Sequence, residues 1–423
     1  MISLRTRCVG PFVLIASFVH AGIVHAEDVV ADSAHWSRFR GPNGTGISDE
    51  RGFPTTWTEE DYAWTTELPG EGHSSPVVWD QRLFVTSAAD EGAVRYVLCL
   101  DPASGAIRWT RAVGMNRSHK HAKSSWASST PATDGERVYV AFADVENHNL
   151  SAYDFDGNLV WRRNLGKFES QHGQGVSPIV YGELVIIPND QDGPSSIVAV
   201  DRRTGRTVWS ALRGGREVSY ATPMILERPG KEPQLICASG VTGITSLDPL
   251  TGGKNWGTSP FPLRTVASPV AGQGVIVGSC GTGGSLGVLL RAVPIDPEGD
   301  VSDGDFVFER KRELPYVPTP VIHAGHLYLW NDNGTAACVA LPGGETVWTR
   351  RVGGTFSGSP VCVDGKLYCI SEQGEVAVIA ASPEYELLGK SPLGVGSHST
   401  PAIAGGRMFL RGFDRLSCLA ARR

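Results

Sequence analysis

Charged residues are scarce in this sequence: Asp, Glu, Lys and Arg make up 19% of its 423 residues. Soluble domains usually carry about 25%, and coiled coils or long surface helices depend on such residues, so the composition argues against both. The formal net charge of −6 provides no basic surface of the kind that binds nucleic acid. We therefore expect no nucleic-acid partner. With 41% hydrophobic residues the chain can bury a large core, which argues against disorder.

Long apolar runs are also missing. Beyond residue 26 no segment reaches the roughly 18 uncharged apolar residues that a membrane-spanning helix requires. Residues 1–26 have the pattern of an export signal, with a basic start, an apolar stretch over residues 12–19 and a small-x-small cleavage pattern at residues 24–26. Because no Cys follows that cleavage site, a lipid anchor is not expected. The sequence predicts an exported, soluble protein, periplasmic or secreted, without a transmembrane segment.

No two cysteines are adjacent, and neither a CxxC nor a CxxCH pattern occurs. Seven cysteines follow residue 26, an odd number that leaves at least one thiol outside intramolecular pairing. Cys362 and Cys369 flank Asp364-Gly365, and a hairpin there would set Cys362 opposite Leu367. The two cysteines would then be too far apart for an unstrained bridge. We expect buried free thiols.

The HExxH and Walker patterns of common enzyme sites are absent. We therefore expect no catalytic residue, and we favour a protein that is not an enzyme. If it is one, the fold discussed below makes a quinoprotein oxidoreductase the alternative.

What the sequence does have is a repeat. A Ser/Thr-Pro dipeptide followed by apolar residues occurs eight times, at intervals of 40 to 55 residues. Each proline can open a strand, where a missing N–H costs little. A turn of the Asp-Gly or Gly-Gly type and a second apolar strand follow, which indicates a hairpin. The prolines are Pro76, Pro131, Pro178, Pro223, Pro269, Pro320, Pro360 and Pro401.

A Gly-x-x-x-Trp pattern follows within most units, and in three of them the glycine ends an Asp-x-x-Ser/Thr-Gly turn. Four strands in 40–50 residues make one blade of a β-propeller. Aromatic residues at the same place in successive blades suit a structural wedge between blades rather than ligand stacking. These blade aromatics are Trp64, Trp109, Trp161, Trp209, Trp256, Phe308 and Trp348.

The eighth unit ends at Arg423 after three strands, and the segment around Trp64 has the register of a fourth strand. An N-terminal strand that completes the last blade would close the ring and remove an exposed edge. The sequence thus predicts an all-β, eight-bladed propeller over residues 57–423, preceded by an N-terminal arm at 27–56. We expect a monomer.

Residues that break the repeat lie in the connections before each Ser/Thr-Pro, which should converge on one face around the central channel. Loops on a rigid scaffold are where function usually sits. The candidate binding residues are His73, His121, Lys123, Trp126, His172, Gln174, Tyr220, Arg264 and His398. Arg216 and Phe356 occupy comparable connections.

A metal site is conceivable at His119 and His121, with His172 as a third ligand. No fixed ligand constellation supports it, so we expect no metal. The Asn189–Gly193 run resembles part of a calcium loop but lacks the distal Glu. We interpret it as a polar hairpin tip that lies away from the channel mouth.

The Asp-x-x-Ser/Thr-Gly-x-x-x-Trp repeat resembles the pyrroloquinoline-quinone (PQQ) repeat. Quinoprotein alcohol dehydrogenases and the propeller lipoprotein of the outer-membrane β-barrel assembly machinery share that repeat. The resemblance covers residues 57–423. The opening Trp36–Gly44 segment, GHSSPVVW and HAKSSWASSTP are similar to exported bacterial PQQ-like propeller proteins. The sequence departs from the dehydrogenases, which carry an adjacent-Cys disulfide and calcium ligands, and from the lipoprotein, whose anchoring Cys is missing.

Three functions follow from the resemblance. The leading hypothesis is a non-enzymatic scaffold that binds a protein or a small or glycan ligand at the loop face, in the manner of an outer-membrane assembly factor. One alternative is a PQQ-dependent alcohol or sugar dehydrogenase, and only this alternative implies PQQ and calcium as cofactors. The other is a carbohydrate-binding propeller in which Trp126, His73 and His172 line the channel mouth.

Overall fold

The computed structural model describes residues 35–215, 217–283 and 288–422. The chain divides into two units, residues 1–31 and 32–423, and all described residues belong to the second. The export signal predicted for residues 1–26 and the candidate Arg216 lie outside the described residues. Within them, the secondary structure consists of strands β1–β34 and three short 3-10 helices. No helix among them is long and apolar enough to cross a membrane.

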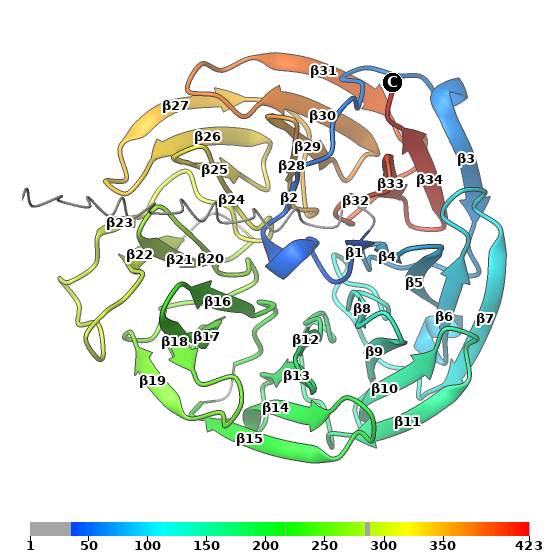
Figure 1. The fold of residues 1–423 in the computed structure, drawn as a ribbon, viewed down its shortest axis with the longest axis horizontal. Helices are drawn as coiled ribbons and strands as arrows, with labels where there is room; N and C mark the ends of the chain where they lie inside the picture. Colours follow the sequence, from blue (N-terminus) through cyan, green and yellow to red (C-terminus); the bar gives the residue numbers. More distant parts are fainter. Residues whose placement is uncertain (1–34, 216, 284–287, 423) are drawn as a thin grey trace, which may run out of the picture. The chain divides into compact units, whose positions relative to one another are not determined.

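Eight sheets, each built on four antiparallel strands, follow one another around a central channel (Figure 1). The first four blades contain, in order, β4 (Val77–Trp79), β5 (Arg82–Ala89), β6 (Val94–Leu100) and β7 (Ile107–Gly114); β8 (Ala132–Thr133), β9 (Arg137–Ala143), β10 (His148–Asp154) and β11 (Leu159–Asn164); β12 (Ile179–Tyr181), β13 (Leu184–Asn189), β14 (Ser195–Asp201) and β15 (Thr207–Arg213); β16 (Met224–Arg228), β17 (Lys231–Ser239), β18 (Gly243–Leu247) and β19 (Lys254–Gly257).

The other four blades complete the circle. They contain β20 (Val270–Gly272), β21 (Val275–Cys280), β22 (Leu289–Pro294) and β23 (Phe308–Arg310); β24 (Val321–His323), β25 (His326–Trp330), β26 (Thr335–Ala340) and β27 (Thr346–Arg351); β28 (Val361–Val363), β29 (Lys366–Ile370), β30 (Glu375–Ala380) and β31 (Leu387–Pro392); β32 (Ala402–Ala404), β33 (Arg407–Arg411), β34 (Arg415–Ala420) and β3 (Tyr62–Glu67). The 3-10 helices are η1 (Pro42–Gly44), η2 (Glu59–Asp61) and η3 (Asp90–Gly92).

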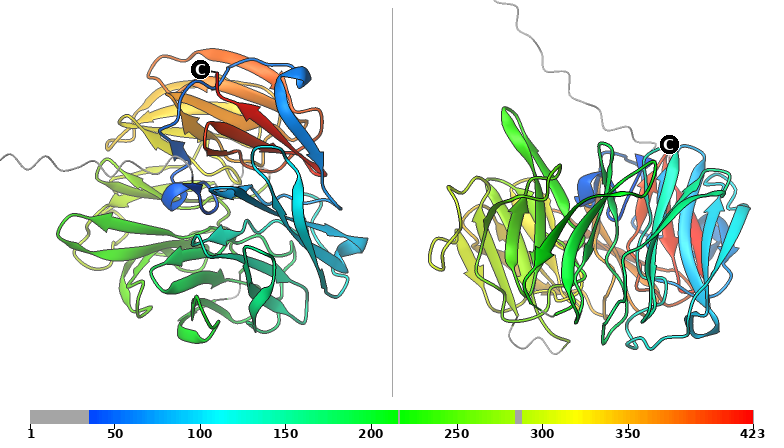
Figure 2. Two further views of the ribbon diagram at one scale, coloured as in Figure 1. Left: turned by 45° about the vertical axis from the view of Figure 1, so that its right-hand side comes forward. Right: turned by 90° about the horizontal axis from the view of Figure 1, so that it is seen from below.

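The N-terminal strand closes the ring as the sequence predicts. β3 pairs antiparallel with β34, with Trp64 opposite Cys418, and forms the outer strand of blade 8. Figures 1 and 2 show this blue strand beside the red C-terminal strand in every view in which both are visible. The eight-bladed, all-β prediction is therefore confirmed.

The Ser/Thr of each Ser/Thr-Pro dipeptide links one blade to the next. Its hydroxyl accepts the backbone N–H of the corresponding residue in the preceding blade, and the last bond, from Thr400 N–H to Ser75 Oγ at 3.2 Å, closes the circle. The members of this hydroxyl belt are Ser75, Thr130, Ser177, Thr222, Ser268, Thr319, Ser359 and Thr400. The sequence interpretation explained only the prolines; the belt explains why a hydroxyl residue precedes them.

The blade aromatics act as wedges between blades. Trp161 Nε1 donates to the Arg202 carbonyl in the turn of the next blade at 3.0 Å. Gly205 in that turn has a φ of +69°, and a Cβ there would lie 2.6 Å from the Trp161 ring. The positive φ and the close approach of the indole ring both favour glycine at this position. The same contact joins Gly105 to Trp64, Gly157 to Trp109, Gly252 to Trp209 and Gly344 to Phe308.

The junction between blades 4 and 5 departs from this rule. Trp256 Nε1 donates to Gln234 Oε1 of its own blade at 3.0 Å. Gly304, the glycine of the next unit, has no heavy atom near its would-be Cβ. Trp256 is nevertheless buried in the core between these blades. Its structural role is retained while its partner differs.

The seven cysteines in the described residues are all buried and free. Cys362 lies opposite Leu367 across the Asp364-Gly365 hairpin, as the sequence predicts. Burial raises the pKa of Cys362 to about 12, so this thiol stays protonated and unreactive at neutral pH.

Residues 35–48 enter the channel and form what we call the plug. β1 (His35–Trp36) pairs with β4, and β2 (Ile47–Ser48) pairs parallel with β28. Between them, η1 lies at the centre of the ring in Figure 1. β1 and β2 meet the innermost strands β4 and β28 at their C-terminal ends, and Arg38 and Arg40 between them extend along the channel to the residues just before β16, β24 and β28. The plug therefore closes the end of the channel opposite the connections that precede those strands.

Arg40 anchors the plug. Its side chain is fully buried, and its five N–H groups donate to five backbone carbonyls, two within the plug and three in blades 6 and 7. The acceptors are the carbonyls of Gly44, Thr45, Thr319, Pro320 and Pro360. Backbone dipoles thus surround a charge that would otherwise be costly to bury.

Candidate functional site

The connections between blades converge on a cavity of about 600 Å³ at the open end of the channel. Seven of the nine candidate binding residues line it: His73, His121, Lys123, His172, Tyr220, Arg264 and His398. Seven members of the hydroxyl belt lie at its base, and Phe39 of the plug also lines it. The sequence thus identified the side chains at the cavity mouth but not its base.

The other two candidates have different positions. Gln174 is buried, and its amide donates to the Val176 carbonyl of its own loop at 2.7 Å. Trp126 lines a smaller cavity of about 370 Å³, which shares His73, Ser124 and His398 with the first. Phe356 is fully buried against Trp330, so it is a core residue and not part of the mouth.

Residues 116–126, which we call the strap, connect β7 to β8 and extend across the mouth. Lys123 Nζ lies 3.1 Å from Glu372 Oε1 in blade 7, and the Lys123 carbonyl lies 3.2 Å from His398 Nδ1 in the connection to blade 8. His121 N–H donates to the His172 carbonyl on the opposite side at 3.3 Å. A single connection therefore contacts three other parts of the ring.

Trp126 fastens the strap rather than facing the main cavity. Its Nε1 donates to the Ser118 carbonyl at 2.8 Å, and Lys120 Nζ lies 4.8 Å from the centre of its ring. Both partners belong to the strap, so the indole is engaged within it.

Four imidazoles form two pairs around the strap. The ring centres of His73 and His398 are 4.5 Å apart, and those of His121 and His172 are 4.9 Å apart. Burial, followed by the nearby His398, Arg411 and Lys120, holds the pKa of His73 well below its usual value. Burial also lowers the pKa of His172 and of His398. At neutral pH these three rings are neutral.

One wall of the cavity carries opposite charges. Arg264 Nη1 lies 3.5 Å from His172 Nε2, and Glu217 lines the same cavity. Burial raises the pKa of the Glu217 carboxyl, although Arg264 opposes that shift. Burial likewise raises the pKa of the Tyr220 hydroxyl. Glu217 lies in the connection that supplied Tyr220, whereas Tyr316, which also lines the cavity, lies in the one before Pro320, where the sequence suggested no candidate.

The hairpin at 189–193 does not have the predicted position. Asn189, Asp190 and Gln191 are buried, and Asp190 forms an ion pair with Arg213 at 3.1 Å. Asp192 accepts the N–H groups of Gln171 and Val218 at 2.9 and 3.1 Å. These polar groups hold two mouth connections together, so the hairpin borders the mouth. The interpretation as a tip away from the mouth was wrong.

His119, His121 and His172 were considered as metal ligands. Within the described ranges, no group of three or more His, Cys, Asp or Glu residues has a metal-binding arrangement. His121 and His172 instead contact each other through their rings.

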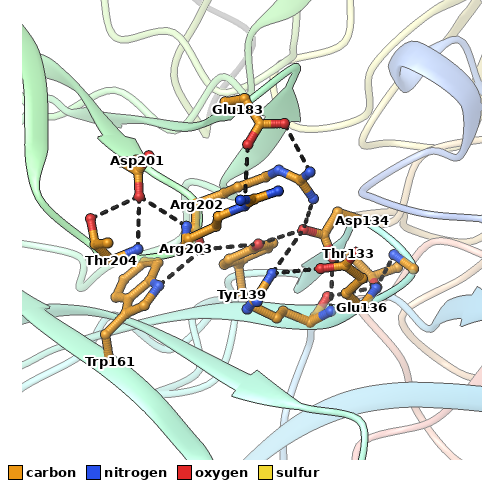
Figure 3. Close-up of polar contacts among 12 residues, drawn as sticks. Thr133, Asp134, Glu136, Tyr139, Trp161, Glu183, Asp201, Arg202, Arg203 and Thr204 are labelled. Carbon is orange, nitrogen blue, oxygen red and sulfur yellow. Dashed lines mark hydrogen bonds and ion pairs between the residues drawn. The ribbon is translucent and has the colours of Figure 1, made fainter.

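A second polar cluster lies away from the cavity, between blades 2 and 3 (Figure 3). Arg202 contacts Asp134 at 2.7 Å and Glu183 at 2.9 Å, and Tyr139 donates to Asp134 at 2.6 Å. Burial alone would raise the pKa of Asp134, but the bonds from Tyr139 and Arg202 lower it. Since the Arg202 carbonyl also accepts the Trp161 N–H, this cluster fastens two blades and is structural.

The fold, the repeat and the mouth together define the class: an eight-bladed propeller of PQQ-like repeats with a cavity at one end of its channel, lined by histidine, hydroxyl and charged residues among others. A family model described as "Outer membrane protein assembly factor BamB" matches residues 94–280 and 309–417. The chain belongs to this family, which confirms the resemblance found in the sequence.

One curated relative is the "Outer membrane protein assembly factor BamB" of Alteromonas naphthalenivorans, 24% identical over 266 residues. The match covers 59% of this chain and 60% of the relative, so the chain spans about three fifths of that protein's length.

Solved structures with very low sequence identity share the fold. A europium-containing methanol dehydrogenase has a TM-score of 0.68 at 12% identity and covers 90% of this chain and 89% of its own. BamB from Moraxella catarrhalis has a TM-score of 0.59 at 13% identity, with coverages of 85% and 99%. A quinohemoprotein alcohol dehydrogenase from Comamonas testosteroni has a TM-score of 0.61 at 14% identity, with coverages of 93% and 81%. At these identities the likeness concerns the fold alone.

Proposed function

We propose that this protein is an exported, monomeric, non-enzymatic scaffold that acts in outer-membrane protein assembly and binds a protein partner at the cavity mouth. Family membership supports the assembly role. The observation that carries the binding face is the distribution of side chains. The repeated residues are used between blades, whereas the non-repeated polar side chains gather at the mouth. Exposed connections on a rigid scaffold are suited to recognition.

Site-specific crosslinking in cells tests the binding face. A photoreactive amino acid at Gln171, an exposed residue of the mouth, should crosslink to an outer-membrane protein or to a component of its assembly machinery. The matched control is Leu250, which is 60% exposed in the turn before β19 and does not line the mouth. Crosslinks of equal yield at both positions would move the partner away from the mouth.

Deletion of the gene tests the assembly role itself. The amount of folded outer-membrane proteins should fall and should be restored by the full-length chain, but not by the same chain without residues 1–26. Unchanged outer-membrane protein levels in the deletion strain would exclude this function.

The PQQ-dependent alternative requires a set of oxygen ligands for calcium in the cavity. Calcium takes six to eight oxygen ligands, usually with several carboxylates, and Glu217 is the one carboxylate among the described residues that line the cavity. This donor set does not fit a calcium-bound quinone. We therefore propose that the protein works without PQQ and calcium.

Calorimetry and a dye-reduction assay test this proposal. Protein mixed with PQQ and Ca²⁺ should show no calcium-dependent, stoichiometric binding and no alcohol- or sugar-dependent dye reduction. One-to-one, calcium-dependent binding with turnover would establish the dehydrogenase instead.

A further inference from the structure

The O–H groups of the hydroxyl belt have no hydrogen-bond acceptor among the described residues. Each belt hydroxyl accepts one backbone N–H, but none donates a hydrogen bond to any residue that the structure describes. The belt residues are all buried, with exposed fractions of 1 to 7%. Seven of the eight line the base of the cavity. Buried donors are almost always satisfied, so the base is built to meet acceptor atoms.

Positive charge surrounds the same level of the channel. Arg38 Nη2 donates to the Pro223 carbonyl at 2.5 Å, Arg40 Nη1 to the Thr319 carbonyl at 2.8 Å, and Arg411 Nη1 to the Ser74 carbonyl at 2.9 Å. Each acceptor is a belt residue or its immediate neighbour in sequence. The three guanidinium groups, two from the plug and one from β33, therefore lie beside the belt at three different places around the ring.

None of these arginines has a carboxylate partner among the described residues. Burial lowers the pKa of each to about 9, so all three remain cations at neutral pH. Burying cations without anions is costly. Carbonyl dipoles offset part of that cost for Arg40, whereas buried nitrogens of Arg38 and Arg411 have no hydrogen-bond partner.

We propose that the base of the cavity is a binding site for a small oxyanion, either free or carried as the carboxylate or phosphate of a larger molecule. The belt hydroxyls donate hydrogen bonds to the oxygens of the anion. The positive charges of the three buried arginines stabilise its negative charge. Arg264 adds a cation at the entrance. Glu217, on the same wall, restricts the anion to the base. This site is independent of the proposed partner at the mouth.

Isothermal titration calorimetry with inorganic phosphate, citrate and sucrose tests the proposal. Phosphate binding at one site supports a free anion. Citrate binding alone supports an organic acid, for which a cavity of about 600 Å³ has room. Binding of neither anion, or equally tight binding of the neutral sucrose, would overturn the proposal.

Variants of one belt residue locate the site. Thr222→Val removes the donor, and the bond that it also loses, from Ser177 N–H at 3.4 Å, is the longest of the belt. Thr222→Ser keeps the hydroxyl and is the matched control. Because a hydrogen bond to a charged group contributes about 1.5–3 kcal/mol, Thr222→Val should weaken anion binding about tenfold or more. Unchanged affinity in folded Thr222→Val would overturn the proposal.

A second variant covers the case in which Thr222→Val does not fold. Arg264→Gln lies outside the belt and is half-buried, so the ring should remain intact. Loss of this cation should weaken anion binding by a smaller factor than Thr222→Val does, and it should leave the thermal unfolding transition of the protein unchanged. Affinity equal to that of the unaltered protein would remove Arg264 from the site and, with an intact fold, contradict the electrostatic part of the proposal.

Discussion

The two ends of the channel are closed by different interactions. At one end, the plug donates from Arg40 to five carbonyls of buried backbone. At the other end, the strap relies on two ion pairs that are exposed or half-exposed, Lys123–Glu372 and Arg117–Asp90, on two imidazole contacts and on a few backbone bonds. Buried, fully satisfied bonds are hard to break, whereas exposed ion pairs contribute little. The plug end should therefore be structural and the strap end adaptable.

The largest expected effect comes from removing the plug together with β3. Deleting residues 27–70 takes away the outer strand of blade 8 and the plug, so the ring should lose its cooperative thermal transition. As the matched change at the other end, strap residues 117–124 are replaced by an equally long Gly/Ser segment, which should change the transition only slightly. Calorimetric scans of both proteins check this, and similar losses would show that the ends do not differ.

The next largest effect is expected for Arg40→Met. This variant leaves five carbonyls without their donor, and we expect a loss of about 3–5 kcal/mol in the free energy of unfolding. Arg51→Met, at an exposed residue just beyond the plug, is the control and should stay within about 0.5 kcal/mol. Chemical denaturation measures both. A loss below about 1 kcal/mol for Arg40→Met would mean that the plug is not anchored by this side chain.

The same contrast explains how much the sequence could predict. The blades, the wedge role of Trp161 and the closing strand with Trp64 were predictable because each belongs to a pattern that recurs along the chain. The hydroxyl belt recurs equally often, but its role depends on hydrogen bonds between residues about 45 positions apart. A single unit does not reveal such bonds.

The plug was not predictable, because Arg40 occurs in a segment without a counterpart elsewhere in the chain. Its three acceptors outside the plug lie about 280 to 320 residues away. At the mouth, residue type and loop position suggested nine candidates, and seven of them line the cavity. Gln174 and Trp126 do not line it, since nothing local indicates whether a polar loop side chain faces the cavity or the backbone of its own connection.

Acidification should affect the strap end more than the plug end. His73 faces His398, Arg411 and Lys120; His398 faces Glu372, Lys120 and Lys123; His172 faces Arg264, His121, His119 and Asp192. The pKa of each of these three histidines is lower in the folded protein. Their contribution to stability is therefore present above the unfolded pKa of about 6.5 and is lost as the pH falls below it.

Hydrogen exchange at pH 7.5 and pH 5 measures this effect separately at each end. Between the two pH values, after correction for intrinsic exchange rates, the strap should lose protection several-fold more than the plug. The double variant His73→Gln/His398→Gln should reduce this difference. Equal changes in residues 116–126 and 35–48 would show that the imidazole pairs do not hold the strap.

The smallest expected effect is that of the strap's Lys123–Glu372 ion pair. Lys123 is about half exposed at its side chain, so Lys123→Met should cost only about 0.2–1 kcal/mol. Glu372→Gln should cost more, because Glu372 also accepts hydrogen bonds from Ser357 at 2.6 Å and Thr355 at 3.2 Å. A double-mutant cycle isolates the pair from those bonds, and the coupling should shrink in high salt. Lys123→Met could instead destabilise the protein as much as Arg40→Met does. The strap would then be held as firmly as the plug, and the adaptable strap end inferred above would be excluded.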